Sequence, residues 1–218
     1  MAVNAVAVRA VAVRAVAVRA VALGPGSSYN GENMGIPRIE RNAAVLVVVD
    51  VQERLLPVIH EAARVRRRVS VAARAARVLD LPVIATEQYP KGLGRTAPAV
   101  MEALGERVPI EKISFSCCGV DEFDRALAAG GSTTVLVAGI ETHVCVLQTC
   151  LDLVDRGLSP VLLADCTGSR HEHDHRFAIE RLRRAGVIVT TLESALFELV
   201  GRAGTDEFRQ ISRLVKPL

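Results

Sequence analysis

Three residues of the types used in hydrolytic catalysis each follow a short segment that is predicted to be a strand. Asp50 follows the apolar run 43–49, Lys112 follows the segment 107–111, and Cys145 comes shortly after the apolar run 133–138. A cysteine thiolate is a nucleophile, a carboxylate can take its proton, and an ammonium group stabilises negative charge on both. These residues could therefore form one hydrolytic site if the three segments end at the same place in the fold.

Each of these residues also has an ordinary structural interpretation. Cys145 could be a small buried hydrophobe, Asp50 could cap the following helix, and Lys112 could be a surface charge. In the functional interpretation, Thr142 is a helix N-cap and Cys145 lies in the first turn. Backbone N–H groups and the helix dipole would lower the pKa of the thiol there. Position alone leaves both interpretations open.

Apolar runs alternate with helical patterns along the chain. Strands are predicted at residues 43–49, 81–85, 107–111, 133–138, 160–164 and 187–190. Helices are predicted at 55–78 (interrupted at Pro57), 98–104, 121–129, 143–156, 172–185, 194–200 and 206–214. This alternation predicts a mainly parallel sheet covered on both faces, with ligands bound beyond the carboxyl ends of its strands. The rule selects Asp50, Glu87, Lys112 and the turn 139–145.

Composition excludes several classes of function. The chain has 218 residues, half of them hydrophobic, which suffices for one domain. A net charge of +3 without a basic stripe, and 3% aromatic residues without Trp, argue against nucleic-acid and membrane partners. The five cysteines have no zinc-site spacing and indicate free thiols in a reducing cytosol. We expect a cytoplasmic protein without a metal or another cofactor.

The first 33 residues form a separate segment. Residues 5–22 repeat the pentapeptide AVAVR, which is amphipathic neither as a helix nor as a strand. The segment could be a targeting peptide, a disordered tail, or an upstream extension of a protein that begins at Met34; we favour the last. We therefore predict a low-complexity tail and linker at 1–33, followed by one domain at 34–218.

Residues 43–214 resemble the isochorismatase-like cysteine hydrolases. The matching segments, in the family's order and spacing, are Val49-Asp50-Val51-Gln52, Lys112 with Phe115-Ser116, and Gly139-Ile140-Glu141-Thr142-His143-Val144-Cys145-Val146. Residues 86–94 and the tail 207–216 resemble the subgroup called isochorismatase domain-containing proteins, whose substrate is poorly defined. The resemblance implies a three-layer α/β/α sandwich with a six-stranded, mainly parallel sheet, and a homo-oligomer.

The resemblance also implies a role for each site residue. Cys145 attacks a carbonyl carbon, Asp50 passes the thiol proton to the leaving group, and Lys112 lies between them as the third member of a catalytic triad. A cis peptide bond between Ile140 and Glu141 helps to aim the backbone N–H groups of Glu141 and Cys145 at the oxyanion. The predicted substrate pocket comprises Gln52, Glu87, Tyr89, Phe115, Ser116 and Thr142.

Departures from the family pattern narrow the predicted chemistry. Nicotinamidases of the family hold a metal through an Asp and several His, whereas Gln52 stands at one such position and residues 87–89 contain no His. His171, His173 and His175 do not share one helical face, so we do not interpret them as a metal site. We predict metal-independent hydrolysis of C–N bonds in a small amide-, imide- or carbamoyl-type substrate through a Cys145 acyl-enzyme.

Two alternatives to this function remain open at the level of the sequence. The first is an enzyme of the same family, either a nicotinamidase or a ureido/carbamoyl amidase. The second belongs to a different class: a non-catalytic protein that binds small molecules or partners and keeps an inert Cys145.

Overall fold

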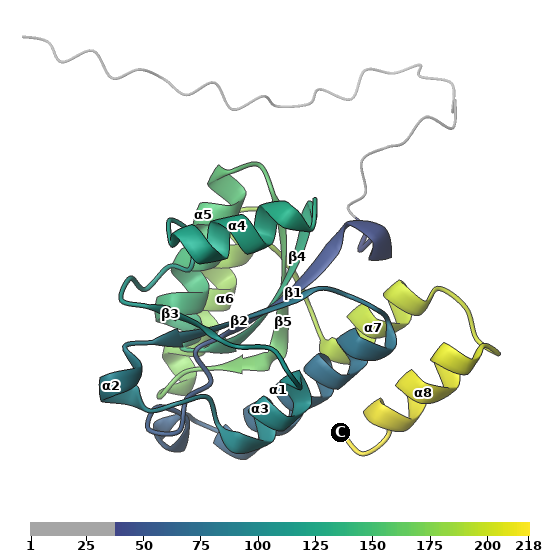
Figure 1. Ribbon diagram of the computed structural model, residues 1–218, viewed down its shortest axis with the longest axis horizontal. Helices are drawn as coiled ribbons and strands as arrows, with labels where there is room; N and C mark the ends of the chain where they lie inside the picture. The colour runs from purple at the N-terminus through teal and green to yellow at the C-terminus, as the bar shows by residue number, and fades with distance from the viewer. Residues whose placement is uncertain (1–37) are drawn as a thin grey trace, which may run out of the picture. The chain divides into compact units, whose positions relative to one another are not determined.

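The computed structural model describes residues 38–218; the predicted tail, 1–33, lies outside the described residues. Six strands form one sheet in the order β3-β2-β1-β4-β5-β6, and every neighbouring pair is parallel (Figure 1). The strands are β1 Ala44–Val49, β2 Val83–Gln88, β3 Ile110–Lys112, β4 Thr134–Ile140, β5 Ser159–Gly168 and β6 Ile188–Thr190.

Helices cover both faces of the sheet. They are α1 Ala62–Val78, α2 Pro90–Leu93, α3 Pro98–Leu104, α4 Asp121–Ala129, α5 Leu147–Asp155, α6 Glu172–Arg184, α7 Leu192–Val200 and α8 Asp206–Val215. Helices α1, α3, α7 and α8 lie on one face and α4, α5 and α6 on the other (Figure 1). This confirms the predicted three-layer α/β/α fold. No helix within residues 38–218 has the length and apolar character needed to cross a membrane.

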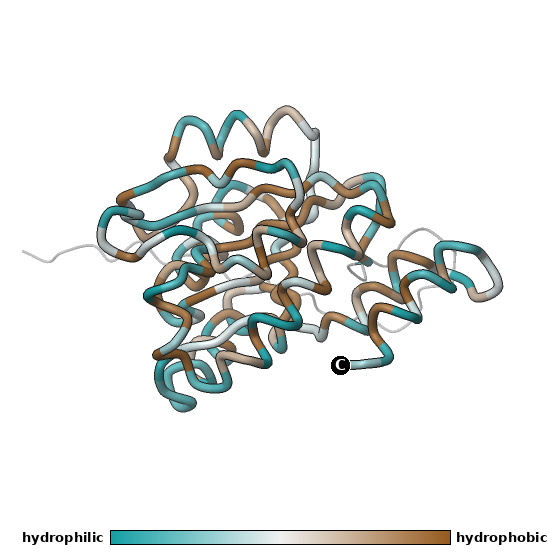
Figure 2. The backbone as a smooth tube through the Cα atoms, turned by 60° about the horizontal axis from the view of Figure 1, so that its bottom comes forward, coloured by the Kyte–Doolittle hydropathy of each residue, from teal (hydrophilic) through white to brown (hydrophobic). Residues whose placement is uncertain are grey.

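The central strand β1 shows why the sheet is buried on both faces. Successive side chains of a strand point to opposite faces, so Leu46 and Val48 join the core under α1 while Val47 and Val49 join the core under α5. Figure 2 shows apolar residues along the central strands and hydrophilic residues on the outer turns of the helices. Burial of each such valine contributes roughly 1.5–3 kcal/mol of hydrophobic stabilisation.

Most predicted elements are present, with differences at their ends. The helix predicted at 55–78 is divided into a 3₁₀ turn, Leu56–Val58, and α1, because Pro57 lacks an amide donor and Glu61 takes a left-handed conformation, φ 55°. Strand β2 continues to Gln88, beyond the predicted end at 85. The short helix α2 was not predicted.

The direction in which the chain adds strands reverses at the central strand. β1 lies between β2 and β4, so the chain runs outward from β1 in one direction through β2 and β3 and in the other through β4, β5 and β6. In open α/β sheets, ligands bind outside the carboxyl ends of the strands at such a switch point. Asp50 directly follows β1, and Cys145 lies in the turn that follows β4.

Candidate active site

Asp50 is a buried carboxylate at the end of β1. Its backbone is left-handed, φ 52°, a conformation that Asp tolerates better than most residues. The side chain is fully buried, and both carboxylate oxygens accept hydrogen bonds: Oδ2 from Nζ of Lys112 at 2.6 Å and Oδ1 from Oγ1 of Thr86 at 2.7 Å. Asp50 therefore caps no helix, and these two hydrogen bonds come from Thr86 of β2 and Lys112 of β3.

Lys112, the last residue of β3, is also fully buried rather than on the surface. Besides Asp50, its Nζ lies 3.2 Å from Oε1 of Gln88, 3.1 Å from the carbonyl of Ser114 and 3.0 Å from the carbonyl of Phe115. A buried ion pair is tolerated when further hydrogen bonds satisfy both charges. The segment after β3 supplies such bonds by turning two carbonyl groups towards the ammonium.

Cys145 lies in a π-helical turn, Thr142–Val146, that joins β4 to α5. The carbonyl of Glu141 accepts hydrogen bonds from the amides of Val144 and Val146, on either side of Cys145. The Cys145 residue is 5% exposed, and its Sγ lies 3.5 Å from Oε1 of Gln88. The peptide bond between Ile140 and Glu141 is cis. All five cysteines are buried free thiols.

The start of this turn differs from the predicted helix cap. Glu141 rather than Thr142 occupies the N-cap position, without a side-chain capping bond. The hydroxyl of Thr142 instead hydrogen bonds with Nδ1 of His175 at 2.9 Å. The capping role predicted for Thr142 is therefore wrong, because the first turn is π-helical and the hydroxyl has a partner on α6.

The pKa of Cys145 is also opposite to the prediction. Burial raises the pKa of the Cys145 thiol well above its ordinary value, and the negative charge of Asp50 raises it further, while the Lys112 ammonium lowers it. Burial dominates because charged sulfur loses its hydration. The resting site thus holds a protonated thiol beside a carboxylate, so attack requires a base that removes the proton as substrate is engaged.

Gly139 sets the distance between the strands that carry Asp50 and Cys145. It has φ 126° and pairs with Val49, and a Cβ at this position would lie 2.1 Å from the carbonyl oxygen of Val49. Only glycine accepts both the conformation and the contact. The two strands therefore approach closely where the site begins.

The predicted pocket residues differ in exposure. Tyr89 and Phe115 are both 52% exposed, whereas Ser116 is buried and accepts a hydrogen bond from the amide of Cys118. Gln52 is fully buried and bonds to both backbone groups of Gln88. Gln52 thus contacts the protein, and a substrate-contacting role for the pocket residues stays a prediction.

Glu87 and Glu141 are buried carboxylates with partners of their own. Glu87 Oε1 accepts hydrogen bonds from the amide and hydroxyl of Thr96, and its Oε2 accepts one from Arg95. Glu141 Oε2 accepts from the amide and Nε of Arg170. Glu87 therefore anchors the loop after α2, and Glu141 anchors the turn to the segment that follows β5.

Two residues that contact Asp50, Lys112 or Cys145 were not predicted, Thr86 and Gln88. Both lie on β2 and contact the site, while Glu87 between them contacts the loop at 95–96. Alternation along a strand puts residues 86 and 88 on one face. This alternation could have been recognised in the sequence, but only if the strand had been predicted to continue to Gln88.

The histidines at 171–175 do not form a metal cluster. His171 is the N-cap of α6 and precedes the helix, and its ring stacks on that of His173. No group of three or more His, Cys, Asp or Glu residues within 38–218 is arranged to hold a metal ion. Gln52 stands where the family resemblance places a ligand His of nicotinamidases. Its side-chain amide makes hydrogen bonds to Gln88 and Gly94 through both its nitrogen and its oxygen, so Gln52 does not fit the role of a metal ligand.

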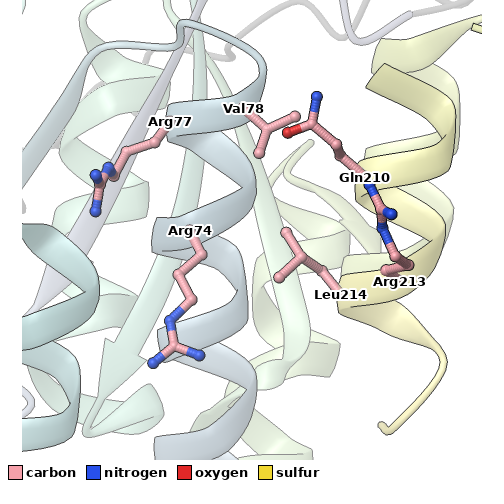
Figure 3. Close-up of a pocket in the computed structure, with 6 residues that line it drawn as sticks. All are labelled: Arg74, Arg77, Val78, Gln210, Arg213 and Leu214. Carbon is pink, nitrogen blue, oxygen red and sulfur yellow. The ribbon is translucent and has the colours of Figure 1, made fainter. Parts of the chain in front are cut away.

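A separate hollow of about 550 Å³ lies between α1 and α8. Figure 3 shows Arg74, Arg77 and Val78 extending from α1 and Gln210, Arg213 and Leu214 from α8. None of these lining residues belongs to the strand-end cluster. The hollow therefore takes no part in the chemistry considered for Cys145.

Comparison with known proteins agrees with this architecture. Residues 44–194 match the family model described as the Isochorismatase domain. Isochorismatase domain-containing protein 1 of Danio rerio is 41% identical over 177 residues, which are 79% of this chain and 61% of that protein. Isochorismatase domain-containing protein 2 of Bos taurus is 39% identical over 183 residues, which are 82% of this chain and 86% of that protein.

A solved structure is also similar. The structure described as MAR1 ribonuclease from Caenorhabditis elegans has a TM-score of 0.77 and 37% sequence identity, covering 82% of this chain and 92% of that one. The sheet order and the strand-end cluster define an α/β protein with the architecture of isochorismatase-like hydrolases. The chain belongs to the isochorismatase family, and its similarity is to the isochorismatase domain-containing proteins.

Proposed function

We propose that the chain is a cysteine-dependent hydrolase that cleaves a C–N bond in a small amide-, imide- or carbamoyl-type substrate, without a catalytic metal. The observation that carries the proposal is the fully buried Asp50–Lys112 ion pair, joined to Cys145 through Oε1 of Gln88. Burying two charges is costly, and an inert cysteine would need neither of them. A small-molecule substrate, a homo-oligomeric state and a cytoplasmic location belong to the same proposal.

The first half of the reaction forms an acyl-enzyme. Sγ of Cys145 attacks the carbonyl carbon while the S–H proton passes to Asp50, giving a tetrahedral intermediate with a negative oxygen. Backbone N–H groups of the Glu141–Cys145 turn would hold that oxygen. Protonated Asp50 then gives its proton to the leaving nitrogen, the C–N bond breaks, and a thioester remains on Cys145.

The second half regenerates the thiol. Asp50 takes a proton from water as the water oxygen attacks the thioester carbonyl, and the carbon–sulfur bond then breaks. The proton returns from Asp50 to Sγ and the acid product leaves. Lys112 stays positively charged throughout the reaction. It stabilises Asp50 while Asp50 is ionised, and it stabilises the sulfur of Cys145 while the sulfur carries negative charge.

The experiment is a screen of amides, imides and carbamoyl compounds with wild type, Cys145→Ala and the matched control Cys150→Ala, which removes another buried thiol. We expect Cys145→Ala to lower kcat/KM by at least about 10³-fold, and Cys150→Ala to stay within about threefold. Intact-protein mass spectrometry after acid quench should show the acyl adduct in wild type and lack it in Cys145→Ala.

Two outcomes of this screen would contradict the proposal. One is hydrolysis at the wild-type rate by Cys145→Ala. The other is cleavage of single-stranded RNA that is unaffected by Cys145→Ala; RNA is included because one similar structure carries the name of a ribonuclease. Absence of any turnover together with tight, stoichiometric binding of a screened compound would favour the non-catalytic binding protein.

Asp50→Asn tests the base separately from the nucleophile. Because the charge of Asp50 raises the pKa of Cys145, we expect this variant to be alkylated by iodoacetamide faster than wild type at pH 7, while its turnover is lost. Peptide mapping after timed labelling gives the rate at Cys145. If Asp50→Asn were labelled more slowly at Cys145 and kept its turnover unchanged, Asp50 would not be the base.

A further inference from the structure

We propose that Gln88 is a positioning residue: its Oε1 holds the S–H group of Cys145 and the ammonium of Lys112 in one arrangement before substrate is attacked. The inference rests on the proposed function, because it concerns the same thiol. It is carried by the contacts of a side chain at the end of β2, where a single oxygen is shared by the nucleophile and the charged partner of the base.

The orientation of the Gln88 amide is determined by its other end. Nε2 can only donate, and it donates to the carbonyl of Ile113 at 2.7 Å. Oε1 must then point the other way, towards Nζ of Lys112 at 3.2 Å and Sγ of Cys145 at 3.5 Å, both of which are donors. The segment after β3 thereby selects which atom of Gln88 faces the thiol.

The backbone of Gln88 is held as firmly as its side chain. Gln52 donates from Nε2 to the Gln88 carbonyl at 2.9 Å and accepts at Oε1 from the Gln88 amide at 2.8 Å. The same Nε2 also donates to the carbonyl of Gly94 at 2.8 Å. Gln52 is itself fully buried, and these bonds leave Gln88 little freedom to move away from the thiol.

An amide oxygen at this position has a specific chemical consequence. It accepts a hydrogen bond from a thiol but has no hydrogen to offer a thiolate, so it stabilises the protonated form of Cys145 and directs the S–H bond. It is too weak a base to take the proton, which must pass to Asp50. Burial and the charge of Asp50 already favour the protonated thiol. Gln88 therefore adds to this preference and keeps the S–H group aligned until a substrate carbonyl is in place.

The distance pattern around Lys112 supports this division of roles. An ammonium has three hydrogens, and four oxygens surround Nζ, of which that of Gln88 is the farthest. Asp50, at 2.6 Å, is the main partner of the charge. Oε1 of Gln88 thus keeps accepting capacity for the thiol while remaining within reach of the ammonium.

The test compares Gln88→Met, Gln88→Glu and the control Gln148→Met, which changes an exposed glutamine of α5. The main readout is the pH profile of Cys145 alkylation by iodoacetamide, followed by peptide mapping, which needs no substrate. We expect the profile to move to lower pH in Gln88→Met, which loses the acceptor, and to higher pH in Gln88→Glu, which puts a second carboxylate beside the sulfur. Gln148→Met should follow wild type.

Turnover and folding give the second readout. We expect Gln88→Met to lower kcat about tenfold with little change in KM, the effect of one lost positioning hydrogen bond. Thermal unfolding of each variant identifies any that fail to fold, and Gln88→Glu, which keeps the size and the acceptor, then carries the test. Profiles that coincide with wild type in the folded Gln88 variants would overturn the inference. The proposed function is judged separately, by hydrolysis in Cys145→Ala.

Discussion

The two halves of the sheet hold their site residues in different ways. On the β1–β2–β3 side, Asp50, Lys112 and Gln88 form one cluster in which both charges are fully buried and depend on each other. On the β4–β5–β6 side, the turn that carries Cys145 is tied to the segment after β5 by several separate polar contacts. These are Glu141 with Arg170, Thr142 with His175, and His143 with Ser169.

This difference bears on how each half tolerates change. In a buried ion pair, removal of one charge leaves the other without compensation, so a single substitution disturbs the whole cluster. Where several neutral or partly exposed contacts share the task, each contributes about 1 kcal/mol and its loss is local. The charged half should therefore be sensitive to single substitutions, and the thiol half tolerant of them.

The largest expected effect is on the charged half. Lys112→Met should lower the free energy of unfolding by about 3–5 kcal/mol, because Asp50 stays buried without its partner. Adding Asp50→Asn should restore a large part of that stability but none of the activity. Urea denaturation of the two single variants and the double variant gives the coupling free energy between Asp50 and Lys112. Additive losses in the double variant would show that the two charges do not depend on each other.

An intermediate effect is expected where the halves meet. Gly139→Ala should cost about 2–4 kcal/mol, since its Cβ would meet the Val49 carbonyl at 2.1 Å and its φ is 126°. Gly131→Ala is the matched control: it also has positive φ, 58°, but a Cβ there meets nothing within 4 Å, so about 1 kcal/mol is expected. Equal losses at both glycines, measured by thermal unfolding, would mean that the close approach of β1 and β4 contributes nothing.

The smallest effect is expected on the thiol half, and it depends on pH. Burial lowers the pKa of His175 below its ordinary value of 6.5, and the nearby charge of Arg64 lowers it further. The unfolded chain then binds a proton at His175 more readily than the folded chain does. The contribution of His175 to the free energy of unfolding should therefore be fully present above about pH 6.5 and fall as the pH drops below it.

His175→Gln keeps a partner for Thr142 but does not titrate. We expect its stability at pH 8 to lie within about 1 kcal/mol of wild type, and its loss of stability between pH 7 and pH 5 to be smaller. Denaturant midpoints across this range check the slope. A steeper decline in the variant would contradict the assigned direction.

Much of the fold and part of the site could be predicted from local patterns. Helices α3 and α4 have the predicted bounds, because proline at the start of α3 and Gly130 after α4 mark these ends in the sequence itself. The strand end at Asp50 could be located because this charged residue follows a short apolar run, and Lys112 follows the strand predicted at 107–111. The predicted parallel sheet also puts the two residues at the same edge of the sheet.

The errors arise where one element depends on another. Thr142 has the residue type of a helix cap, yet its hydroxyl bonds with His175, thirty-three positions away. The pKa of Cys145 was predicted from a helix terminus, whereas burial under the surrounding layers dominates it. Gln88 was missed because the end of β2 depends on pairing with β3, where Gln88 is in register with Lys112.

By itself, the sequence determined the alternation of strands and helices, the residues that end the strands, and the set of groups able to carry the chemistry. These follow from apolar periodicity and residue type, which act over a few neighbouring positions. Only the tertiary structure decided that Asp50 and Lys112 are buried together, that burial keeps the thiol protonated at rest, and that Gln88 contacts both Lys112 and Cys145. Burial and pairing depend on segments distant along the chain, and their energies arise only when the layers have packed.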